Sequence, residues 1–396
     1  MLKGKTVLIG VAGGIAAYKT AGLVSMLVKQ GACVHVIMTE HAVNFINPIT
    51  FETLSGNKCI VDTFDRNFQH KVEHVSLGKQ ADVLMIAPAT ANVIGKLANG
   101  IADDMLTTTF LACRCPVLLA PAMNTAMYQN PIVQDNMEKL KGYGCRVIEA
   151  ASGYLACGDT GSGKMPEPDV LYQYIEKEIA FEKDMKGKRV MVTAGPTEEA
   201  LDPVRYITNH SSGKMGYALA RAAMLRGADV TLVSGPVSLK PPMDVKMISV
   251  VSAADMFRAV TEHFEEQDIV IKAAAVADYR PVSVNREKVK KKEEQFSLPM
   301  ERTRDILQYL SEHKRKGQFL CGFSMETEHM ISNSREKLVK KHLDMIVANN
   351  LKEAGAGFQA DTNVVTLITQ EEEINLGLMS KDEVAHSILD KILSNL

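Results

Sequence analysis

The chain has 396 residues, of which 46% are hydrophobic and 23% charged. This length is too great for one ordinary hydrophobic core, so we expect a globular protein of two domains. The formal net charge of -2 excludes a strong overall attraction to nucleic acid or to an anionic membrane surface.

Cysteine usage and hydropathy narrow the class further. The seven cysteines include no CxxC pair, which argues against a disulfide framework or a thiolate zinc site. No apolar run reaches the roughly 18–20 residues that a membrane-spanning helix needs. We therefore expect a cytoplasmic protein whose ligands are small molecules.

The two halves of the sequence begin in the same way. Lys-Gly-Lys precedes an apolar strand at residues 6–10 and another at residues 189–193, and glycines follow each strand. In each half a helical segment then leads through Gly-Ala to a second apolar strand. Continuous apolar runs separated by helical segments are typical of parallel strands buried on both faces. We predict an α/β protein with two doubly wound, Rossmann-like domains.

The boundary between the halves is expected within residues 165–186. The first domain would then span residues 1–180 and the second residues 186–396. The last segment contains VVTLIT and a run of three glutamates, which predicts an added hairpin and a final helix. Third and fourth strands are expected to begin at Asp82 and Pro116 in the first half, and at Asp268 and Gln318 in the second.

The second half contains an insertion. Lys3 and Lys186 are 183 residues apart, whereas Gly31 and Gly227 are 196 apart, so the second half has 13 extra residues. They fall in PTEEALDPVRYITNHSSGKMG, directly after the first strand. Because open α/β sheets bind ligands at the carboxyl ends of their strands, we expect this polar loop to be functional.

Strand ends in the first half carry small and polar residues. Gly13 and Gly14 expose backbone N–H groups at a strand-to-helix turn, where a phosphate can bind. The full dinucleotide pattern GxGxxG is missing, because VAGGIAAYK has only adjacent glycines. This difference counts against NAD and is compatible with a mononucleotide.

His74 and Cys157 are the candidate reactive side chains of this half. His74 precedes the third strand, and alone it could equally be a surface or capping residue. Cys157 lies in a glycine-rich segment, which favours an exposed thiol over a core position. The same segment matches the Walker pattern from Gly158 to Lys164. Met165 stands where that pattern needs Ser or Thr, so we reject a P-loop.

Several motifs occur together here: GGIAAYK, HVSLGKQAD, PATANVIGKLANGIADD, PAMNTAMYQNP and ACGDTGSGKM. In this combination the first 180 residues resemble the homo-oligomeric flavin-containing cysteine decarboxylases, in particular the phosphopantothenoylcysteine decarboxylase domain of the bifunctional coenzyme A biosynthesis family. The resemblance implies trimers with FMN held between subunits. It implies that His74 is the active-site base, that Asn124 contacts the substrate carboxylate and that Cys157 donates a proton from a mobile flap. It implies FMN contacts at Gly14, Ile15, Thr39, Thr90, Asn92 and Ala122.

The inserted loop of the second half combines hydroxyl and backbone donors. Ser211, Ser212 and Gly213 stand immediately before a helix and predict an anion cradle. Asn209 lies in the same loop, where an Asx turn is the simpler explanation. Asp278 ends the third strand and could cap a helix or face a nucleotide.

Basic side chains gather in two further places. Lys288 begins the run KVKKK, which two glutamates follow, so the run could be a solvated face or a lid over a triphosphate. Lys337 and Lys341 lie four residues apart and share one helical face.

The second half resembles the phosphopantothenate–cysteine ligase domain of the same bifunctional family, through TAGPTEEALDPVRYITNHSSGKMG, AAAVADYRP, KVKK, GFSMETE and KKHLDMIVANN. The resemblance implies that the ligase uses CTP and Mg²⁺ and forms an acyl-cytidylate intermediate. It implies that Asn209 stabilises this intermediate and that Lys288 is the first lysine of a lid over the site. Thr303-Arg304-Asp305-Ile306 departs from the Asn-Pro-Asp-Ile of many relatives, so the resemblance implies no nucleotide contact in that loop. The nucleotide contacts implied are Ala274, Asp278, Phe323, Lys337 and Lys341.

Together the two resemblances imply one enzyme that uses 4'-phosphopantothenate, cysteine and CTP. Decarboxylase trimers and ligase dimers would together allow a dodecamer. One rival is a two-domain NAD(P)-dependent dehydrogenase, which lacks support because GxGxxG is missing. A second rival is a non-catalytic flavoprotein regulator, which has no need of His74, Asn124 and Cys157. Mg²⁺ is expected to bind together with CTP, and its protein ligands are not assigned from the sequence.

Overall fold

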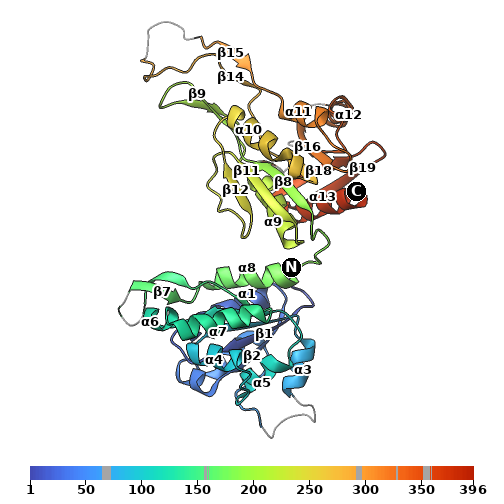
Figure 1. Cartoon of the computed structure of the whole chain (residues 1–396). Coiled ribbons are helices and arrows are strands. Elements are labelled where there is room, and N and C mark those ends of the chain that lie inside the picture. The colour runs from blue at the N-terminus through green and yellow to red at the C-terminus, as the bar shows by residue number, and fades with distance from the viewer. Residues whose placement is uncertain are drawn as a thin grey trace. The chain divides into compact units, whose positions relative to one another are not determined.

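The structure is a computed structural model of the whole chain. It consists of two compact units, Met1–Phe181 and Glu182–Leu396 (Figure 1). No helix in the described part of the chain is long and apolar enough to cross a membrane. The structure describes residues 1–64, 73–155, 158, 160–290, 297–326, 329–350, 357 and 359–396.

The first unit contains a five-stranded parallel sheet in the order β2-β1-β3-β4-β5. An antiparallel hairpin follows it, made of β6 and β7. The strands are β1 (Thr6–Val11), β2 (Cys33–Met38), β3 (Val83–Ala89), β4 (Val117–Pro121), β5 (Arg146–Val147), β6 (Ala151–Tyr154) and β7 (Thr160–Lys164).

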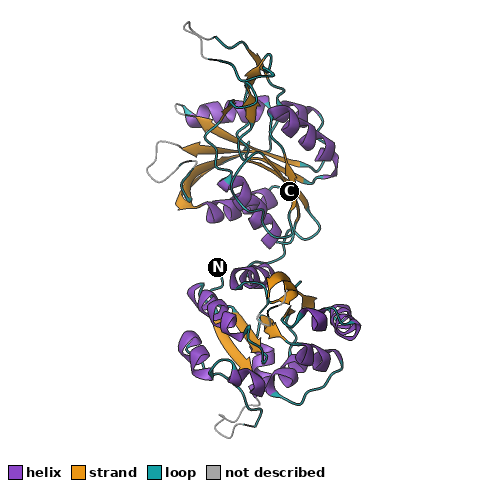
Figure 2. Cartoon of the chain, turned by 90° about the vertical axis from the view of Figure 1, so that its left-hand side faces the viewer, coloured by secondary structure: helices purple, strands orange, loops and turns teal. Residues whose placement is uncertain are grey.

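Helices cover both faces of this sheet (Figure 2). Along β1, Val7 and Ile9 enter one core, whereas Leu8 enters the other, because successive side chains of a strand point to opposite faces. The first core contains residues of α1 (Ala17–Lys29), α2 (Pro48–Ser55) and α8 (Pro168–Ile179). The second contains residues of α3 (Glu73–Gln80), α4 (Ala91–Ala98), α5 (Met105–Ala112) and α7 (Pro131–Gly142).

The second unit contains an eight-stranded sheet in the order β12-β11-β8-β13-β16-β17-β18-β19. Neighbours from β12 to β17 are parallel, whereas β18 and β19 are antiparallel. The strands are β8 (Arg189–Ala194), β11 (Asp229–Ser234), β12 (Lys246–Ser249), β13 (Ile269–Lys272), β16 (Phe319–Glu326), β17 (Met345–Asn350), β18 (Thr362–Ile368) and β19 (Glu373–Ser380).

Helices cover both faces of the second sheet as well (Figure 2). On one face α9 (Lys214–Leu225) packs against α13 (Lys381–Ser394). The core of the other face contains residues of α10 (Ala253–His263), α11 (Ile306–Glu312) and α12 (Met330–Lys340). Two doubly wound α/β units confirm the predicted fold class, and the hairpin β18–β19 with α13 confirms the predicted C-terminal addition.

Two details differ from the sequence analysis. The strand expected third in the second half is the fourth, because the short edge strand β12 precedes it. β12 is only four residues long and lies at the sheet edge, so it has no continuous apolar run to reveal it. The 13-residue insertion, expected as a loop, contains a hairpin of β9 (Glu198–Ala200) and β10 (Tyr206–Thr208).

The two topologies predict a ligand site in each unit. In doubly wound sheets, ligands bind where the strand order reverses, at the carboxyl ends of the strands. This point lies between β1 and β3 in the first unit and between β8 and β13 in the second.

The contribution of α8 to the first core can be tested by truncation. We expect residues 1–181 to fold alone, because α8 buries Leu171 and Ile175 completely within this unit. Residues 1–167 lack α8 and should fail to unfold cooperatively, since losing one buried Leu or Ile side chain costs about 2–5 kcal/mol. Thermal denaturation followed by circular dichroism distinguishes the two fragments. Equal stability of both would show that α8 is dispensable.

Candidate active sites

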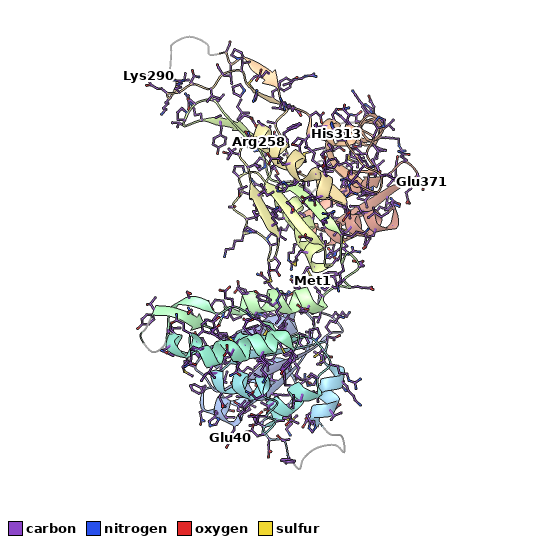
Figure 3. The ribbon with its side chains drawn as sticks, viewed as in Figure 1. Met1, Glu40, Arg258, Lys290, His313 and Glu371 are labelled. Carbon is purple, nitrogen blue, oxygen red and sulfur yellow. The ribbon has the colours of Figure 1, made fainter. Side chains whose placement is uncertain are left out.

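The first unit has an open pocket of about 1040 Å³ at its strand-order reversal. Residues that follow β1, β2, β3 and β4 line it, together with residues from both ends of the β6–β7 hairpin. Glu40, labelled in Figure 3, lies on its rim. The pocket therefore collects the strand ends that the sequence analysis singled out.

Two threonines of this pocket offer hydroxyl groups. Thr39 follows β2 and is 6% exposed, and its Oγ1 has no hydrogen-bond partner among the residues that the structure describes. A buried hydroxyl without a partner costs free energy, so a ligand atom at this point would stabilise the site. Thr90 caps α4 and accepts a bond from the Val93 N–H at 3.4 Å. These groups fit an anionic mononucleotide such as FMN.

The β6–β7 hairpin is joined to this pocket by a close backbone approach. The Met123 N–H donates to the Gly163 carbonyl at 3.0 Å. Gly163 has φ of +119°, and a Cβ there would lie 2.4 Å from the Met123 carbonyl oxygen, so only glycine fits. Asn124 follows directly and caps the short helix α6 (Thr125–Tyr128). The hairpin base and Asn124 are thus held at one place.

Most of the first-unit predictions meet at this pocket, and one does not. His74 is in the first turn of α3, which packs against α5 and does not line the pocket. In Figure 1, α3 lies away from α6 and β7. Cys157 lies outside the described residues. The predicted residues that line the pocket are Gly14, Ile15, Thr39, Thr90, Asn92, Ala122 and Asn124.

Large apolar side chains are exposed around the same pocket. Ile15 is 59% exposed and Tyr154 is 72% exposed. Tyr18 and Met127 are also exposed, and all four line the pocket. Exposed apolar groups gathered at one site often mark a contact surface.

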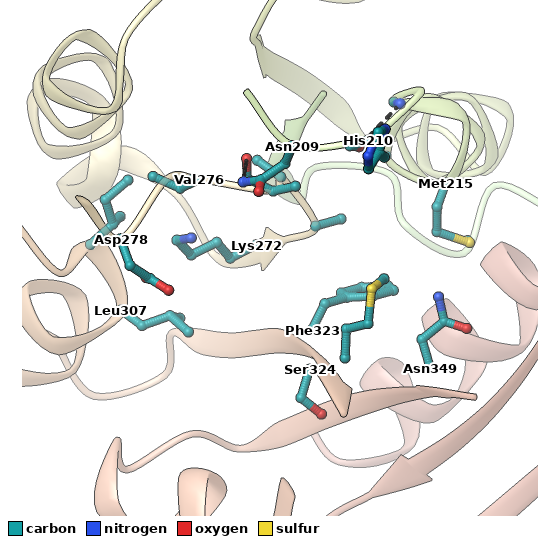
Figure 4. Close-up of a pocket in the computed structure, with 18 of the residues that line it drawn as sticks. Asn209, His210, Met215, Lys272, Val276, Asp278, Leu307, Phe323, Ser324 and Asn349 are labelled. Atoms are coloured by element: carbon teal, nitrogen blue, oxygen red, sulfur yellow. Dashed lines mark hydrogen bonds between the residues drawn. The ribbon is translucent and has the colours of Figure 1, made fainter. Parts of the chain in front are cut away.

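The second unit has an open pocket of about 840 Å³ at its own strand-order reversal (Figure 4). The inserted segment, the start of α9 and the ends of β13, β16 and β17 contribute to it. Among the described residues, seven Lys or Arg side chains and two acidic side chains line it. The pocket is therefore basic, although the whole chain has a formal net charge of -2.

The start of α9 is brought close to the sheet by a glycine. A Cβ at Gly216 would lie 2.5 Å from the Ala194 Cβ, so a larger residue would push the helix off β8. Ser211, Ser212 and Gly213 precede α9 and line the pocket. Unpaired N–H groups at a helix start favour an anion. The three residues of the predicted anion cradle therefore lie at the pocket, and anion binding by them stays a prediction.

The segment after β13 is fixed by buried hydroxyl groups. The Thr193 Oγ1 accepts from the Ala274 N–H at 3.1 Å, and the Thr197 Oγ1 accepts from the Ala277 N–H at 3.0 Å. Asn209 donates from its Nδ2 to the Ala275 carbonyl at 3.0 Å. Asn209 therefore bridges the insertion to this segment through its side chain and contributes more than a local Asx turn.

Lys288 is the one described second-unit prediction that does not line the pocket. The remaining basic residues of its run beyond Lys290, which is labelled in Figure 3, lie outside the described residues. The predicted residues that line the pocket are Asn209, Ser211, Ser212, Gly213, Ala274, Asp278, Phe323, Lys337 and Lys341.

An ion pair of the insertion holds the Lys288 segment instead. The Asp202 side chain is fully buried and accepts from the Arg205 guanidinium at 2.6 Å and from the Val289 N–H at 3.1 Å. Arg205 also donates to the Val289 carbonyl at 2.7 Å. The bond from Arg205 holds the pKa of Asp202 well below its usual range. Asp202 and Arg205 together fix the residue next to Lys288.

Several residues that line the second-unit pocket were not predicted from the sequence. Asp305, in the segment that departs from the family pattern, accepts from the Lys341 Nζ at 2.5 Å. Burial opposes its ionisation, but hydrogen bonds, first that from Lys341, hold the pKa of Asp305 below its usual value. The prediction was based on the AAAVAD motif, which begins directly after Lys272, and therefore did not include Lys272. The missed lining residues include Lys214, Lys272, Asp305, Asn349, Asn363 and Lys381.

Comparison with known proteins identifies the family. Residues 1–180 match the flavoprotein family, and residues 185–396 match the DNA/pantothenate metabolism flavoprotein C-terminal domain. A coenzyme A biosynthesis bifunctional protein of Bacillus subtilis (strain 168) is 50% identical over 396 residues, covering 99% of this chain and 97% of that protein. The chain belongs to the coenzyme A biosynthesis bifunctional protein family. It is thus a bifunctional enzyme with a flavoprotein decarboxylase and a ligase.

Two further relatives support a full-length relationship. A coenzyme A biosynthesis bifunctional protein of Vibrio cholerae serotype O1 is 46% identical over 393 residues, covering 99% of this chain and 98% of that protein. A cysteine/cysteine sulfinic acid decarboxylase of an unknown prokaryotic organism is 47% identical over 355 residues, covering 88% of this chain and 99% of that protein.

The Asp202 contacts predict how the Lys288 segment is held. Asp202→Asn removes the charge that Arg205 and the Val289 N–H contact, so the segment should come loose. We expect ligase kcat/KM to fall roughly ten-fold. Limited trypsin digestion should cut faster after Lys288 and Lys290.

Asp229→Asn is a matched control, because Asp229 is exposed and lies outside the pocket. It should leave both readouts unchanged. Unaltered digestion of the Asp202→Asn enzyme would show that Asp202 does not anchor this segment.

Proposed function

We propose that residues 186–396 join 4'-phosphopantothenate to cysteine with CTP and Mg²⁺, and that residues 1–180 decarboxylate the product to 4'-phosphopantetheine with FMN. The observation that carries the proposal is the pair of pockets at the two strand-order reversals, one with an unpaired buried hydroxyl at Thr39 and one strongly basic. We further propose that the enzyme acts in the cytoplasm.

In the decarboxylase, the ends of four strands would hold FMN through Gly14, Thr39, Thr90 and neighbouring residues. When bound, FMN would supply reversible two-electron chemistry: it would accept a hydride from the carbon that bears the thiol, which gives the carboxylate an electron sink, and return it after CO2 has left. Asn124 orients that carboxylate from the N-terminus of α6. His74 takes up the thiol proton, and Cys157 returns a proton to the carbon that loses CO2.

His74 reaches a flavin site only if a second subunit supplies it. Within one chain α3 does not line the pocket, whereas exposed apolar side chains such as Ile15 and Tyr154 do. A trimer that covers these side chains and brings α3 of one subunit to the pocket of the next would complete the site. This arrangement accounts for the separation of His74 from Asn124.

In the ligase, the carboxylate of 4'-phosphopantothenate attacks the α-phosphorus of CTP and pyrophosphate leaves. The cysteine amine then attacks the acyl carbon and CMP leaves. The start of α9 and the pocket lysines offset the charge that builds up on the phosphates. Asn209, fixed by its bond to Ala275, presents its second amide hydrogen to the acyl intermediate. Mg²⁺ typically enters such a site bound to the substrate phosphates.

We propose that ligase units pair through the β9–β10 hairpin and the neighbouring antiparallel pair β14 (Tyr279–Pro281) and β15 (Met300–Arg302). Exposed apolar side chains lie on all of these segments except β9, among them Tyr206, Tyr279 and Met300. Burial of this surface between two subunits would also change the surroundings of Lys288, whose segment contacts the same hairpin. Dimers of this kind and flavin-domain trimers would together give a dodecamer.

Shared decarboxylase sites predict rescue between two inactive variants. His74→Asn and Asn124→Asp should each suppress CO2 release. In mixed oligomers of the two, some sites receive His74 from one subunit and Asn124 from another. We expect about a quarter of the wild-type decarboxylase activity per site for random mixing. Coexpression with two affinity tags isolates the mixed oligomers. Their complete inactivity would place both residues in one subunit.

The ligase proposal predicts the effect of one substitution in the insertion. Asn209→Asp keeps the size of the side chain but replaces an amide donor with a negative charge, which disfavours the anionic intermediate. Losing one such donor costs roughly 10²–10³ in rate. Ligase turnover and decarboxylation are measured in the same full-length protein, so decarboxylation is the internal control. Normal ligation by this variant would show that Asn209 is only structural.

A further inference from the structure

Lys272 ends β13 at the centre of the second-unit sheet. Parallel pairing places it opposite Thr193 of β8 and Gly322 of β16, so its side chain leaves the sheet at the ligand-binding edge. Lys272 is partly buried and lines the pocket. Figure 4 shows its side chain extending toward the Asp278 side of the pocket.

The Lys272 ammonium has no hydrogen bond or ion pair with any residue that the structure describes. Two other pocket lysines differ in this respect. Lys214 pairs with Asp361 at 2.7 Å, and Lys381 donates to the Gly357 carbonyl at 3.0 Å. Their ammonium groups hold neighbouring segments in place around the pocket, whereas the Lys272 ammonium makes no such contact with the described residues. A partly buried charge without a partner costs free energy that a bound anion would recover.

Four charged groups face Lys272 from the surrounding segments. The pKa of Lys272 is lowered to about 8, with burial as the largest cause and the charges of Lys337 and Lys341 in the α12 region as further causes. Asp305, before α11, and Asp278, after β13, act in the opposite direction. Asp305 is already bonded to Lys341. The surroundings therefore leave the Lys272 ammonium destabilised until an anion enters.

We propose that Lys272 binds the phosphate groups of the nucleotide in the ligase pocket. This assignment rests on the proposed function. We assign the nucleotide to Lys272 in preference to 4'-phosphopantothenate, because Lys272 faces Lys337 and Lys341 and lies two residues before Ala274. These are three positions at which the family resemblance implies nucleotide contacts.

Lys272 should then determine how nucleotide binding depends on pH. An anion beside the ammonium raises its pKa in the complex, so binding is strongest below about pH 8 and weakens as the free enzyme loses the proton above it. The weakening approaches ten-fold per pH unit at most, since a single proton is involved. Arginine at this position keeps its charge over the whole range.

The test measures the Kd of CTP with Mg²⁺ for the full-length protein by calorimetry from pH 6.5 to 9.5. Lys272→Gln should weaken binding at neutral pH by roughly 10- to 100-fold and abolish the weakening above pH 8 relative to wild type. Lys272→Arg should restore binding and keep it constant with pH. Lys246→Gln is the matched control, because Lys246 is exposed on β12 and should bind CTP as the wild type does.

A stability measurement separates this role from a structural one. Because burial lowers the pKa of Lys272, its charge opposes folding at neutral pH. Lys272→Gln should therefore unfold at a temperature no lower than wild type while it loses affinity. A structural lysine would lower the unfolding temperature and the affinity together.

Three results would overturn the proposal. Lys272→Gln could bind CTP with the wild-type affinity and pH dependence. It could bind CTP and release pyrophosphate normally but fail to form the amide, which would point to a base for the cysteine amine. Lys272→Gln could also lose affinity together with stability. A wild-type enzyme that does not bind CTP at all would instead contradict the proposed function on which this assignment rests.

Discussion

The convergence of parallel strand ends is the constraint on which both sites depend. In each sheet the connections on either side of the first strand leave in opposite directions, so the loops after neighbouring strands separate and a pocket opens between them. Backbone N–H groups, hydroxyls and lysines at these strand ends face one space. The buried strands could not contain those groups without losing their apolar packing. Their chemistry is therefore confined to the residues that follow each strand.

Charged side chains are also unevenly distributed over the molecule. The chain as a whole is slightly acidic, yet the described lining of the second-unit pocket has seven Lys or Arg side chains and two acidic ones. Part of this charge is neutralised by fixed partners, as in the pairs of Lys214 with Asp361 and of Lys341 with Asp305. Lys272 has no such partner among the described residues. Fixed pairs shape the pocket, and cations such as Lys272 that have no ion pair among the described residues give it affinity for an anion.

Strands and the residues at their ends could be predicted from the sequence, because both depend on local sequence pattern. Apolar runs predicted the strands β1 and β8, and glycine and hydroxyl residues after the runs indicated strand-end positions such as Thr39 and Ser211. Features set by tertiary placement could not be read in this way. His74 has a familiar motif around it, but its distance from Asn124 depends on the packing of α3 against α5. The pKa of Lys272 depends in part on the charges of Asp305, Lys337 and Lys341, which are remote from it in sequence.

The central claim is that one chain makes and then decarboxylates 4'-phosphopantothenoylcysteine. Incubating the full-length enzyme with FMN, 4'-phosphopantothenate, cysteine, CTP and Mg²⁺, followed by mass detection of the products, tests it directly. The account predicts 4'-phosphopantetheine, CMP, pyrophosphate and CO2, and no product when CTP is left out. Release of CO2 from cysteine alone, with cysteamine as the product, would contradict it and align this chain with its cysteine-decarboxylating relative.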